Sequence, residues 1–278
     1  MALKTNVVDR VSTYPGRVKL TPVSGQSNVY DLSRADSPIQ DGTPINAALF
    51  AGKADVLTKN STVYVSAASG SDTYGDGSET APFATIQKAI NSIPKNLEGK
   101  TCTVMVPAGN YSERVTIDGF HGGKLNLSGN ATINGGITVT YSNHVYITFP
   151  NLRFNSAFSQ SILMADAGSV VTLGGNNFAV DGGSGYVNAV EAAQGSTIFV
   201  DGDLDISNCA RNAVFAHDGS RIVISGALTG NNNTSGGVRS TTGSVVSYGS
   251  RTLAASTASV TQSGGRIYSG AQNTIPSY

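Results

Sequence analysis

One pattern occurs four times in this chain: Gly168-Ser169-Val170-Val171-Thr172-Leu173, Gly195-Ser196-Thr197-Ile198-Phe199-Val200, Gly219-Ser220-Arg221-Ile222-Val223-Ile224 and Gly243-Ser244-Val245-Val246-Ser247-Tyr248. Each copy is a Gly-Ser pair followed by a short, largely apolar run. The first glycines are 27, 24 and 24 residues apart, and a looser copy, Gly264-Gly265-Arg266-Ile267-Tyr268, follows 21 residues later. Repeats of this length, rich in β-branched residues and in Gly, Asn and Ser turns, are typical of a solenoid.

The two 24-residue units match beyond their first turn. Ile198 aligns with Ile222, Leu204 with Leu228, and Val214 with Val238. Apolar residues therefore recur in columns, which stacked coils about 4.8 Å apart bury while pairing every strand with its neighbours. No unit carries a long stripe with the 3.6-residue period of a helix. The sequence predicts an all-β parallel β-helix.

Composition excludes several classes of partner. The 278-residue chain is 13% charged with a net charge of zero, which is not the footprint of a nucleic-acid or membrane-surface protein. No apolar run approaches the ~20 residues of a spanning helix. Because Met1-Ala2-Leu3-Lys4 leads into polar residues, we expect no signal peptide and synthesis in a cytoplasm.

Residues 1–60 differ from the rest and form the first predicted domain. A β-hairpin is expected from Arg17–Val23 and Asn28–Leu32, and a short helix from Ile45 to Phe50, after the N-cap Thr43 and Pro44. So small a segment buries too little surface for a large core. We expect an attachment module that folds against a partner or against copies of itself.

The β-helix is predicted over 61–250. Near its start, residues 82–93 have apolar side chains on one helical face and end before Pro94, which predicts an amphipathic helix that caps the first coil. Beyond Arg251 the apolar residues become sparse. Residues 251–278 are therefore expected to form a C-terminal cap or an inter-chain segment.

The beginning of this block resembles a known fold family. The segments that carry the resemblance are Tyr64-Val65-Ser66, Gly70-Ser71-Asp72, Pro82–Ile90 and Val106–Tyr111 with Glu113. They are similar to the opening segment of pectin-lyase-like right-handed β-helix proteins. The resemblance implies a right-handed solenoid, but lyases, hydrolases, adhesins and viral spikes share that segment, so it does not select a function.

A second resemblance lies in the first 60 residues. The segments Leu32–Pro38 and Gly42–Ala48 are similar to the N-terminal segment of tail fibre and tail spike proteins of tailed bacteriophages. This resemblance implies a virion component whose residues 1–60 bind other tail, baseplate or neck proteins. It further implies a homotrimer whose β-helix faces the polysaccharide of the host surface.

Three carboxylates are the candidate catalytic residues. Asp201, Asp203 and Asp205 alternate with Gly202, Leu204 and Ile206, so on one strand they share a face at about 6.6 Å spacing, near the lower limit for inverting glycosidases. Three acids can also hold Ca²⁺. The alternative is a solvated outer face, and the next coil favours it because it carries no acids in the same columns.

A second group of residues is a candidate ligand site. Asp181 begins the insertion that makes one coil three residues longer, and Tyr186 at its end lies near Glu191, as expected of a sugar contact. Arg211 could act as the base or clamp of a lyase that acts on uronates. A turn residue that bonds to the backbone is the alternative for Arg211.

Other polar residues are expected to be structural. Cys102 and Cys209 are predicted to be small buried residues rather than a disulfide or a metal site. His144 and His217 are placed on turns, and with His121 they lack the spacing of metal ligands. Asn208 and Asn232 share a column, which predicts an internal Asn ladder. We expect no metal or cofactor unless the three aspartates bind Ca²⁺.

These observations lead to three hypotheses of function. The first is a virion component of the tail fibre or tail spike type that attaches to host-surface glycan. The second is an enzyme, a polysaccharide lyase or glycosidase that depolymerises the glycan. The third is a purely structural decoration or collar fibre.

Overall fold

The computed structural model describes residues 11–12, 18–25, 30–34, 38–40, 56–148, 151–153, 160–174, 178–183, 185 and 187–270. Contacts between residues divide the chain into two units, Met1–Ala54 and Asp55–Tyr278. The division falls close to position 60, where the character of the sequence changes.

The described part of the first unit contains two short antiparallel strand pairs. β2 (Val18–Pro22) and β3 (Tyr30–Arg34) form a hairpin, which confirms the hairpin predicted there. β1 (Val11–Ser12) pairs with β4 (Pro38–Gln40). The predicted helix Ile45–Phe50 lies outside the described residues.

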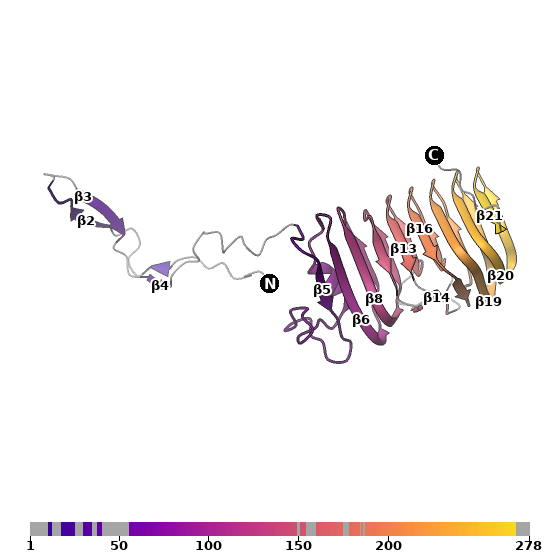
Figure 1. Ribbon diagram of the computed structural model, residues 1–278, viewed down its shortest axis with the longest axis horizontal. Coiled ribbons are helices and arrows are strands. Elements are labelled where there is room, and N and C mark those ends of the chain that lie inside the picture. Colours follow the sequence, from indigo (N-terminus) through magenta and orange to yellow (C-terminus); the bar gives the residue numbers. More distant parts are fainter. Residues whose placement is uncertain are drawn as a thin grey trace. The chain divides into compact units, whose positions relative to one another are not determined.

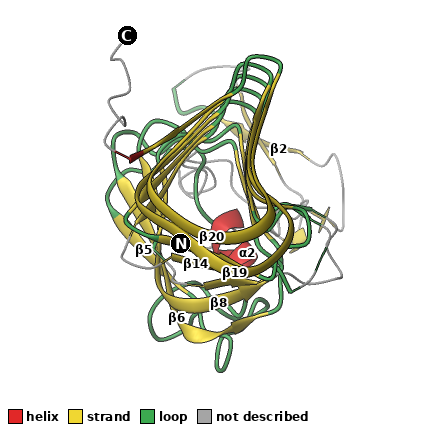
Figure 2. Ribbon diagram, turned by 90° about the vertical axis from the view of Figure 1, so that its right-hand side faces the viewer, coloured by secondary structure: helices red, strands yellow, loops and turns green. Residues whose placement is uncertain are grey.

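The second unit is a parallel β-solenoid of about six turns. Its described strands form one 17-stranded sheet in which all strand pairs are parallel, and strands of successive turns lie side by side along the stack (Figure 1). Each complete turn contributes to three faces, here called A, B and C. Seen along the stack, the coils lie one behind another (Figure 2).

The three faces contain the following strands. Face A consists of β5 (Ser61–Tyr64), the first parts of β6 (Thr101–Tyr111) and β8 (Lys124–Asn134), β10 (Val145–Ile147), β13 (Val170–Gly174), β16 (Thr197–Asp201), the first parts of β19 (Arg221–Thr241) and β20 (Val245–Gln262), and β21 (Arg266–Ser269). Face B consists of later parts of the four long strands with β11 (Asn151–Arg153), β14 (Phe178–Asp181) and β17 (Leu204–Ser207). Face C consists of β7 (Val115–Asp118), β9 (Ile137–Thr140), β12 (Leu163–Asp166), β15 (Val190–Ala192), β18 (Asn212–Ala216) and the ends of β19 and β20.

The apolar columns predicted from the 24-residue spacing are present. Ile198 pairs with Ile222 and Leu204 with Leu228, and all four side chains are buried. Burial alternates along β16, so the second and fourth residues of its repeat run point into the core while the first and third point outward. The parallel β-helix is therefore confirmed.

The solenoid continues beyond position 250, where the sequence pattern places its end. β20 extends to Gln262, and β21 pairs with it in parallel. Few apolar residues remain in this region, but Tyr248 and Leu253 are buried and Ile267 packs against the core. One or two buried residues in each segment are enough to extend the columns.

The Gly-Ser pairs form the corner between faces C and A. Each corner has two consecutive residues with positive φ, of which the second is glycine, as at Gln194 (φ 50°) and Gly195 (φ 74°). Glycine adopts this conformation without steric cost. The following serine is buried, and with Ser142, which follows Tyr141 rather than a glycine, these serines form a column of side chains: Ser142, Ser169, Ser196, Ser220 and Ser244.

Hydrogen bonds join most of this serine column. Ser142 N donates to Ser169 Oγ (3.2 Å), Ser169 N to Ser196 Oγ (3.0 Å) and Ser220 N to Ser244 Oγ (3.0 Å). The column is interrupted between Ser196 and Ser220, whose hydroxyl is buried without a hydrogen-bond partner among the described residues. The serines thus satisfy buried backbone N–H groups at the corner.

A short helix occurs within the range 82–93 in which one is predicted. α2 (Ile86–Asn91) has Thr85 as its N-cap and buries Ile86, Ala89 and Ile90. It contacts β6 and β7, and in the view along the stack it lies within the outline of the coils (Figure 2). The helix is shorter than predicted because residues before Thr85 are extended, with Phe83 bridging Val65.

Two carboxylates hold the N-terminal end of α2. Glu113 accepts the backbone N–H groups of Ile86 (2.8 Å) and Gln87 (2.9 Å), and Asp72 accepts those of Ala84 (2.8 Å) and Thr85 (3.1 Å). Burial raises the pKa of Glu113 despite these bonds. For Asp72 burial also raises the pKa, but the hydrogen bonds from Thr85 and Ala84 outweigh it and lower the pKa.

Replacing Ser169 by alanine tests the serine column. The variant loses the bond from Ser142 N and the bond that Ser169 Oγ donates to Asp166 O (2.6 Å). Because a buried N–H group is left unpaired, we expect a loss of about 1–3 kcal/mol in the free energy of unfolding. Denaturant unfolding measures it, with Ser128→Ala, at a half-buried serine of face A, as the control. Equal stability of the two variants would contradict a role for the column.

Candidate functional site

The three aspartates do not lie on one strand as predicted. Asp201 ends β16, Asp203 lies in the corner, and Asp205 is in β17. The chain turns at Gly202, whose φ is 124°, so the alternation of a single strand is broken. No three His, Cys, Asp or Glu side chains of the described residues form a group that could hold a metal ion, and Ca²⁺ at this trio stays a prediction.

Two of these aspartates bond to the next coil. Asp203 Oδ1 accepts the N–H of Ala227 (2.7 Å), and Asp205 Oδ2 accepts the hydroxyl of Thr229 (2.8 Å). Asp205 Oδ1 also accepts the hydroxyl of Ser207 (3.1 Å). These bonds account for Asp203 and Asp205 without catalysis, and a catalytic role of the trio stays a prediction.

The predicted Asn ladder is present and begins with Asp181. Asn232 Nδ2 donates to Asn208 Oδ1 (3.3 Å), and Asn208 Nδ2 donates to Asp181 Oδ1 (3.0 Å). Asn208 and Asn232 have φ of 59° and 58°, in the left-handed region that Asn tolerates. The ladder lies at the surface of a corner and not in the interior, because Asn232 is exposed and Asn208 half-buried.

Of the other predicted ligand residues, Arg211 lies in the same corner as Asn208, between β17 and β18, whereas Glu191 lies on another face. Tyr186 is outside the described residues, so its contact with Glu191 stays a prediction. Arg211 is exposed at the corner before β18. Glu191 lies on β15 of face C, where it is 9% exposed.

Glu191 is the centre of a polar cluster that joins three coils. Its Oε2 accepts hydrogen bonds from Asn188 Nδ2 (2.6 Å) and from Ser161 Oγ. Its Oε1 lies 2.9 Å from His217 Nε2, and His217 Nδ1 lies 2.8 Å from Asp218 Oδ2. An imidazole protonated on both nitrogens donates to both carboxylates. Both carboxylate oxygens of Glu191 are thus engaged within the fold.

Aromatic and cationic groups extend this cluster along face C. The His217 ring stacks on Phe215, with centroids 4.5 Å apart, and the Arg239 guanidinium lies 5.4 Å from the Phe215 centroid. Arg239 also donates to Gln262 Oε1 (2.8 Å). Glu191, Phe215 and Arg239 occupy one column in register. Their 24-residue spacing was readable from the sequence, but only Glu191 was predicted.

A partly buried guanidinium lies at the start of face C. Arg114 donates to Gly135 O and Ser161 O, both at 2.8 Å, and its Nε donates to Thr138 Oγ1 at 3.0 Å. Burial lowers the pKa of Arg114 to about 10. Since Ser161 also bonds to Glu191, polar contacts run from Arg114 to Asp218 across successive coils. This network uses its donors and acceptors internally and fastens the coils together.

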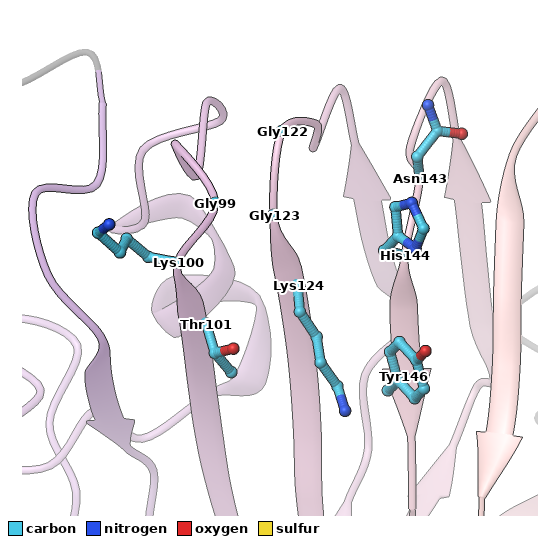
Figure 3. A pocket seen from close by; sticks show the side chains of 9 residues that line it. All are labelled: Gly99, Lys100, Thr101, Gly122, Gly123, Lys124, Asn143, His144 and Tyr146. Atoms are coloured by element: carbon cyan, nitrogen blue, oxygen red, sulfur yellow. The ribbon is translucent and has the colours of Figure 1, made fainter.

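A hollow lies on face A, and a ligand can enter it without breaking hydrogen bonds between the coils. It has a volume of about 450 Å³ and is formed by three successive coils (Figure 3). The residues that line it are Gly99, Lys100, Thr101, Gly122, Gly123, Lys124, Asn143, His144 and Tyr146. No pattern in the sequence indicates this hollow.

Backbone requirements produce the hollow. Gly99 and Gly122 lie at corners with φ of 72° and 74°. At Gly123 a Cβ atom would lie 2.4 Å from Lys100 O and 2.5 Å from Leu97 Cβ, so no side chain fits there. Three positions of the corner are therefore without side chains, and the surface is recessed between the residues that follow them.

The chemistry of the hollow is cationic and aromatic. Lys124 extends towards Tyr146, with its Nζ 3.6 Å from the ring centroid, whereas Lys100 points away from this pair (Figure 3). His144 and Tyr146 project from neighbouring outward positions, and none of the described residues that line the hollow is acidic. An ammonium group over a ring, beside hydroxyl and amide groups, suits an anionic ligand with an apolar face.

The two cysteines have the predicted structural role. Cys102 and Cys209 are both buried and unpaired. Burial raises the pKa of both thiols, which keeps them protonated and unreactive. No helix among the described residues has the length and apolar character needed to cross a membrane.

Comparisons with known proteins give no relative of this chain. No protein-family model matches it, and neither a curated protein nor a solved structure matches it.

Replacing Glu191 by glutamine tests the Glu191 cluster. The amide group has no charge, so the charge-assisted hydrogen bonds that the carboxylate makes with Ser161, Asn188 and His217 are weakened or lost. We expect the free energy of unfolding to fall by about 1–3 kcal/mol at neutral pH. Thermal unfolding measures the change, and Glu79→Gln, at an exposed glutamate, is the control. If both variants unfold like the parent, the cluster does not fasten the coils.

Proposed function

We propose that this chain is an attachment protein that binds a glycan of a host-cell surface through the hollow on face A. The observation that carries the proposal is the placement of Lys124 over Tyr146 in a recess without acidic residues. The volume of about 450 Å³ lies within the range typical of small-ligand sites.

The residues of the hollow are suited to a sugar. Tyr146 offers a ring face for the apolar side of a pyranose, and Thr101 and Asn143 offer hydrogen bonds to hydroxyl groups. Lys124 adds a charge for an acidic substituent. These side chains project from a rigid stack of paired strands, so little conformational entropy is lost when a ligand binds.

The setting of this attachment protein is a bacteriophage virion, as a tail fibre or tail spike component. The resemblance of residues 32–48 to phage proteins supports this part of the proposal, and that of residues 64–113 supports a right-handed coil. In this setting residues 1–60 bind other virion proteins, and three copies assemble into a trimer. The chain is made in the host cytoplasm and then becomes part of the particle.

A second candidate function is cleavage of the bound polysaccharide. The observation that favours it is the carboxylate–imidazole–carboxylate arrangement of Glu191, His217 and Asp218, which is suited to moving protons. Asp201, Asp203 and Asp205 are the alternative acids predicted from the sequence. A purely structural fibre would neither bind nor cleave.

Mixing the full chain with purified host-surface polysaccharide tests these functions. Attachment predicts retention without new reducing ends or unsaturated uronate, and Tyr146→Ala should weaken retention about fivefold to tenfold through loss of ring contacts. Tyr74→Ala, at a tyrosine that is 89% exposed in a loop, is the control and should bind like the parent. Both variants are first compared with the parent by circular dichroism.

Two outcomes would contradict attachment through the hollow. One is the absence of retention, as expected of a structural fibre. The other is retention that is equal for the parent, Tyr146→Ala and Tyr74→Ala. Cleavage that Asp203→Asn leaves intact and His217→Ala abolishes would assign an enzymatic role to the Glu191 cluster rather than to the aspartate trio.

A further inference from the structure

We infer that the ligand is a linear acidic polysaccharide that lies along face A, parallel to the stack, and that the hollow is one of three binding positions for it. The inference rests on the proposed glycan attachment and names the chemical class and the path of the ligand. It follows from the register of the outward-facing residues.

Three outward aromatic residues of face A share one column, whereas Tyr64 of β5 pairs with Met105 in the next one. Strand pairing places Tyr146 beside Thr172, Thr172 beside Phe199, and continues through Val223 and Ser247 to Tyr268. At about 4.8 Å for each strand, the three rings are separated by roughly 10 Å and roughly 14 Å along the stack. Phe199 is 39% exposed and Tyr268 36% exposed, which is unusual for large apolar side chains in this solenoid.

The cations of face A occupy the adjacent outward column. Pairing continues from Thr197 to Arg221, then through Val245 to Arg266. Lys124 lies in the same column. Leu125, the residue after Lys124, pairs with Val145, and Val145 pairs with Val171, so Lys124 aligns with the residues that precede Val145 and Val171. Every ring of the aromatic column therefore has a cation on its own strand or on the strand next to it.

Three positions result, each with one ring and one cation. The first is Tyr146 with Lys124, in the hollow (Figure 3). The second is Phe199 on β16 with Arg221 on the adjoining β19, and the third is Tyr268 with Arg266 on β21. Threonine hydroxyls, such as those of Thr172 and Thr197, lie between them on the same surface.

The charges of the molecule are separated between faces. Among the described outward residues of face A, Asp201 at the end of β16 is the single acidic one. Face C and its corner carry acids on several coils: Asp118, Asp166, Glu191 and Asp218. Face C also carries Arg114 and Arg239, but both donate hydrogen bonds to neighbouring coils. Face A therefore presents an excess of positive charge among its described outward residues, and a polyanion is attracted to it.

These features favour an acidic glycan over a nucleic acid. The cations are few and widely spaced, and the acids of the other faces oppose a general attraction to phosphate backbones. Rings and hydroxyls between the charges suit sugar units. Because each position is small and exposed, affinity has to come from several positions on one polymer, which predicts that binding rises with chain length.

Affinity electrophoresis of the full chain tests the inference. The gels contain polygalacturonate, whose charges are carboxylates, teichoic acid, whose charges are phosphodiesters, or neutral dextran. We expect retardation by at least one acidic polymer, weaker retardation in added NaCl, and none in dextran. The acidic polymer that retards the protein shows whether carboxylates or phosphodiesters are the charged groups that face A binds. Short oligosaccharides of it should compete poorly.

Charge-reversal variants locate the path. Arg221→Glu and Arg266→Glu should each weaken binding of the acidic polymer about fivefold or more. Arg153→Glu, at an exposed residue of face B, is the matched control and should bind like the parent. Equal effects of all three substitutions, or none from Arg221→Glu and Arg266→Glu, would overturn the inference.

The remaining outcomes separate this inference from the proposed function. Binding of dextran that depends on Tyr146 but not on Arg221 or Arg266 would retain glycan attachment and refute the acidic path. Stronger binding of a single-stranded oligonucleotide than of any glycan would identify a nucleic acid as the ligand. It would overturn both the glycan attachment and the acidic path. Retardation by no polymer would also overturn both.

Discussion

Parallel stacking in register is the constraint on which the rest of this structure depends. Each residue of a coil lies beside one particular residue of the next coil, as Ile198 lies beside Ile222. Inside, the constraint requires apolar columns, together with serines that satisfy the buried N–H groups of the corners. Outside, it allows unlike residues to follow one another, so binding groups can be placed at chosen intervals along a rigid surface.

The polar residues of the solenoid divide into two groups by what their hydrogen bonds do. Glu191, Asp203 and Asp205 bond to residues of adjacent coils and so help to hold the coils together. Among the described residues, the cations beside the rings of face A have no such carboxylate partners on that face. This difference, and not the number of acidic or basic residues, separates the surface that supports the fold from the surface available to a ligand.

Much of the fold could be predicted from the sequence, because inward residues repeat. The spacing of the Gly-Ser pairs placed Ile198 with Ile222 and Asn208 with Asn232, and both pairings are present. The aspartate trio was misplaced because Gly202 turns the chain between Asp201 and Asp203. After such a turn, the side chains that follow no longer alternate in step with those of the strand before it.

The hollow could not be predicted in the same way. Lys124 and Tyr146 lie in coils before the regular repeat, where spacing gives no alignment, and their contact is diagonal. The hollow also depends on missing side chains at Gly99, Gly122 and Gly123, which a search for chemical groups overlooks. The column of Glu191, Phe215 and Arg239, in contrast, was within reach of the 24-residue spacing.

The most direct test of the account is a disulfide between neighbouring coils. Thr197 and Arg221 are partners in register on face A, at a separation that suits a disulfide between cysteines placed there. The double variant Thr197→Cys/Arg221→Cys should form this bond on mild oxidation, while the buried Cys102 and Cys209 stay reduced. If mass spectrometry of the folded protein finds the introduced cysteines unbridged, residues 24 apart do not stack, and the columns of face A do not exist.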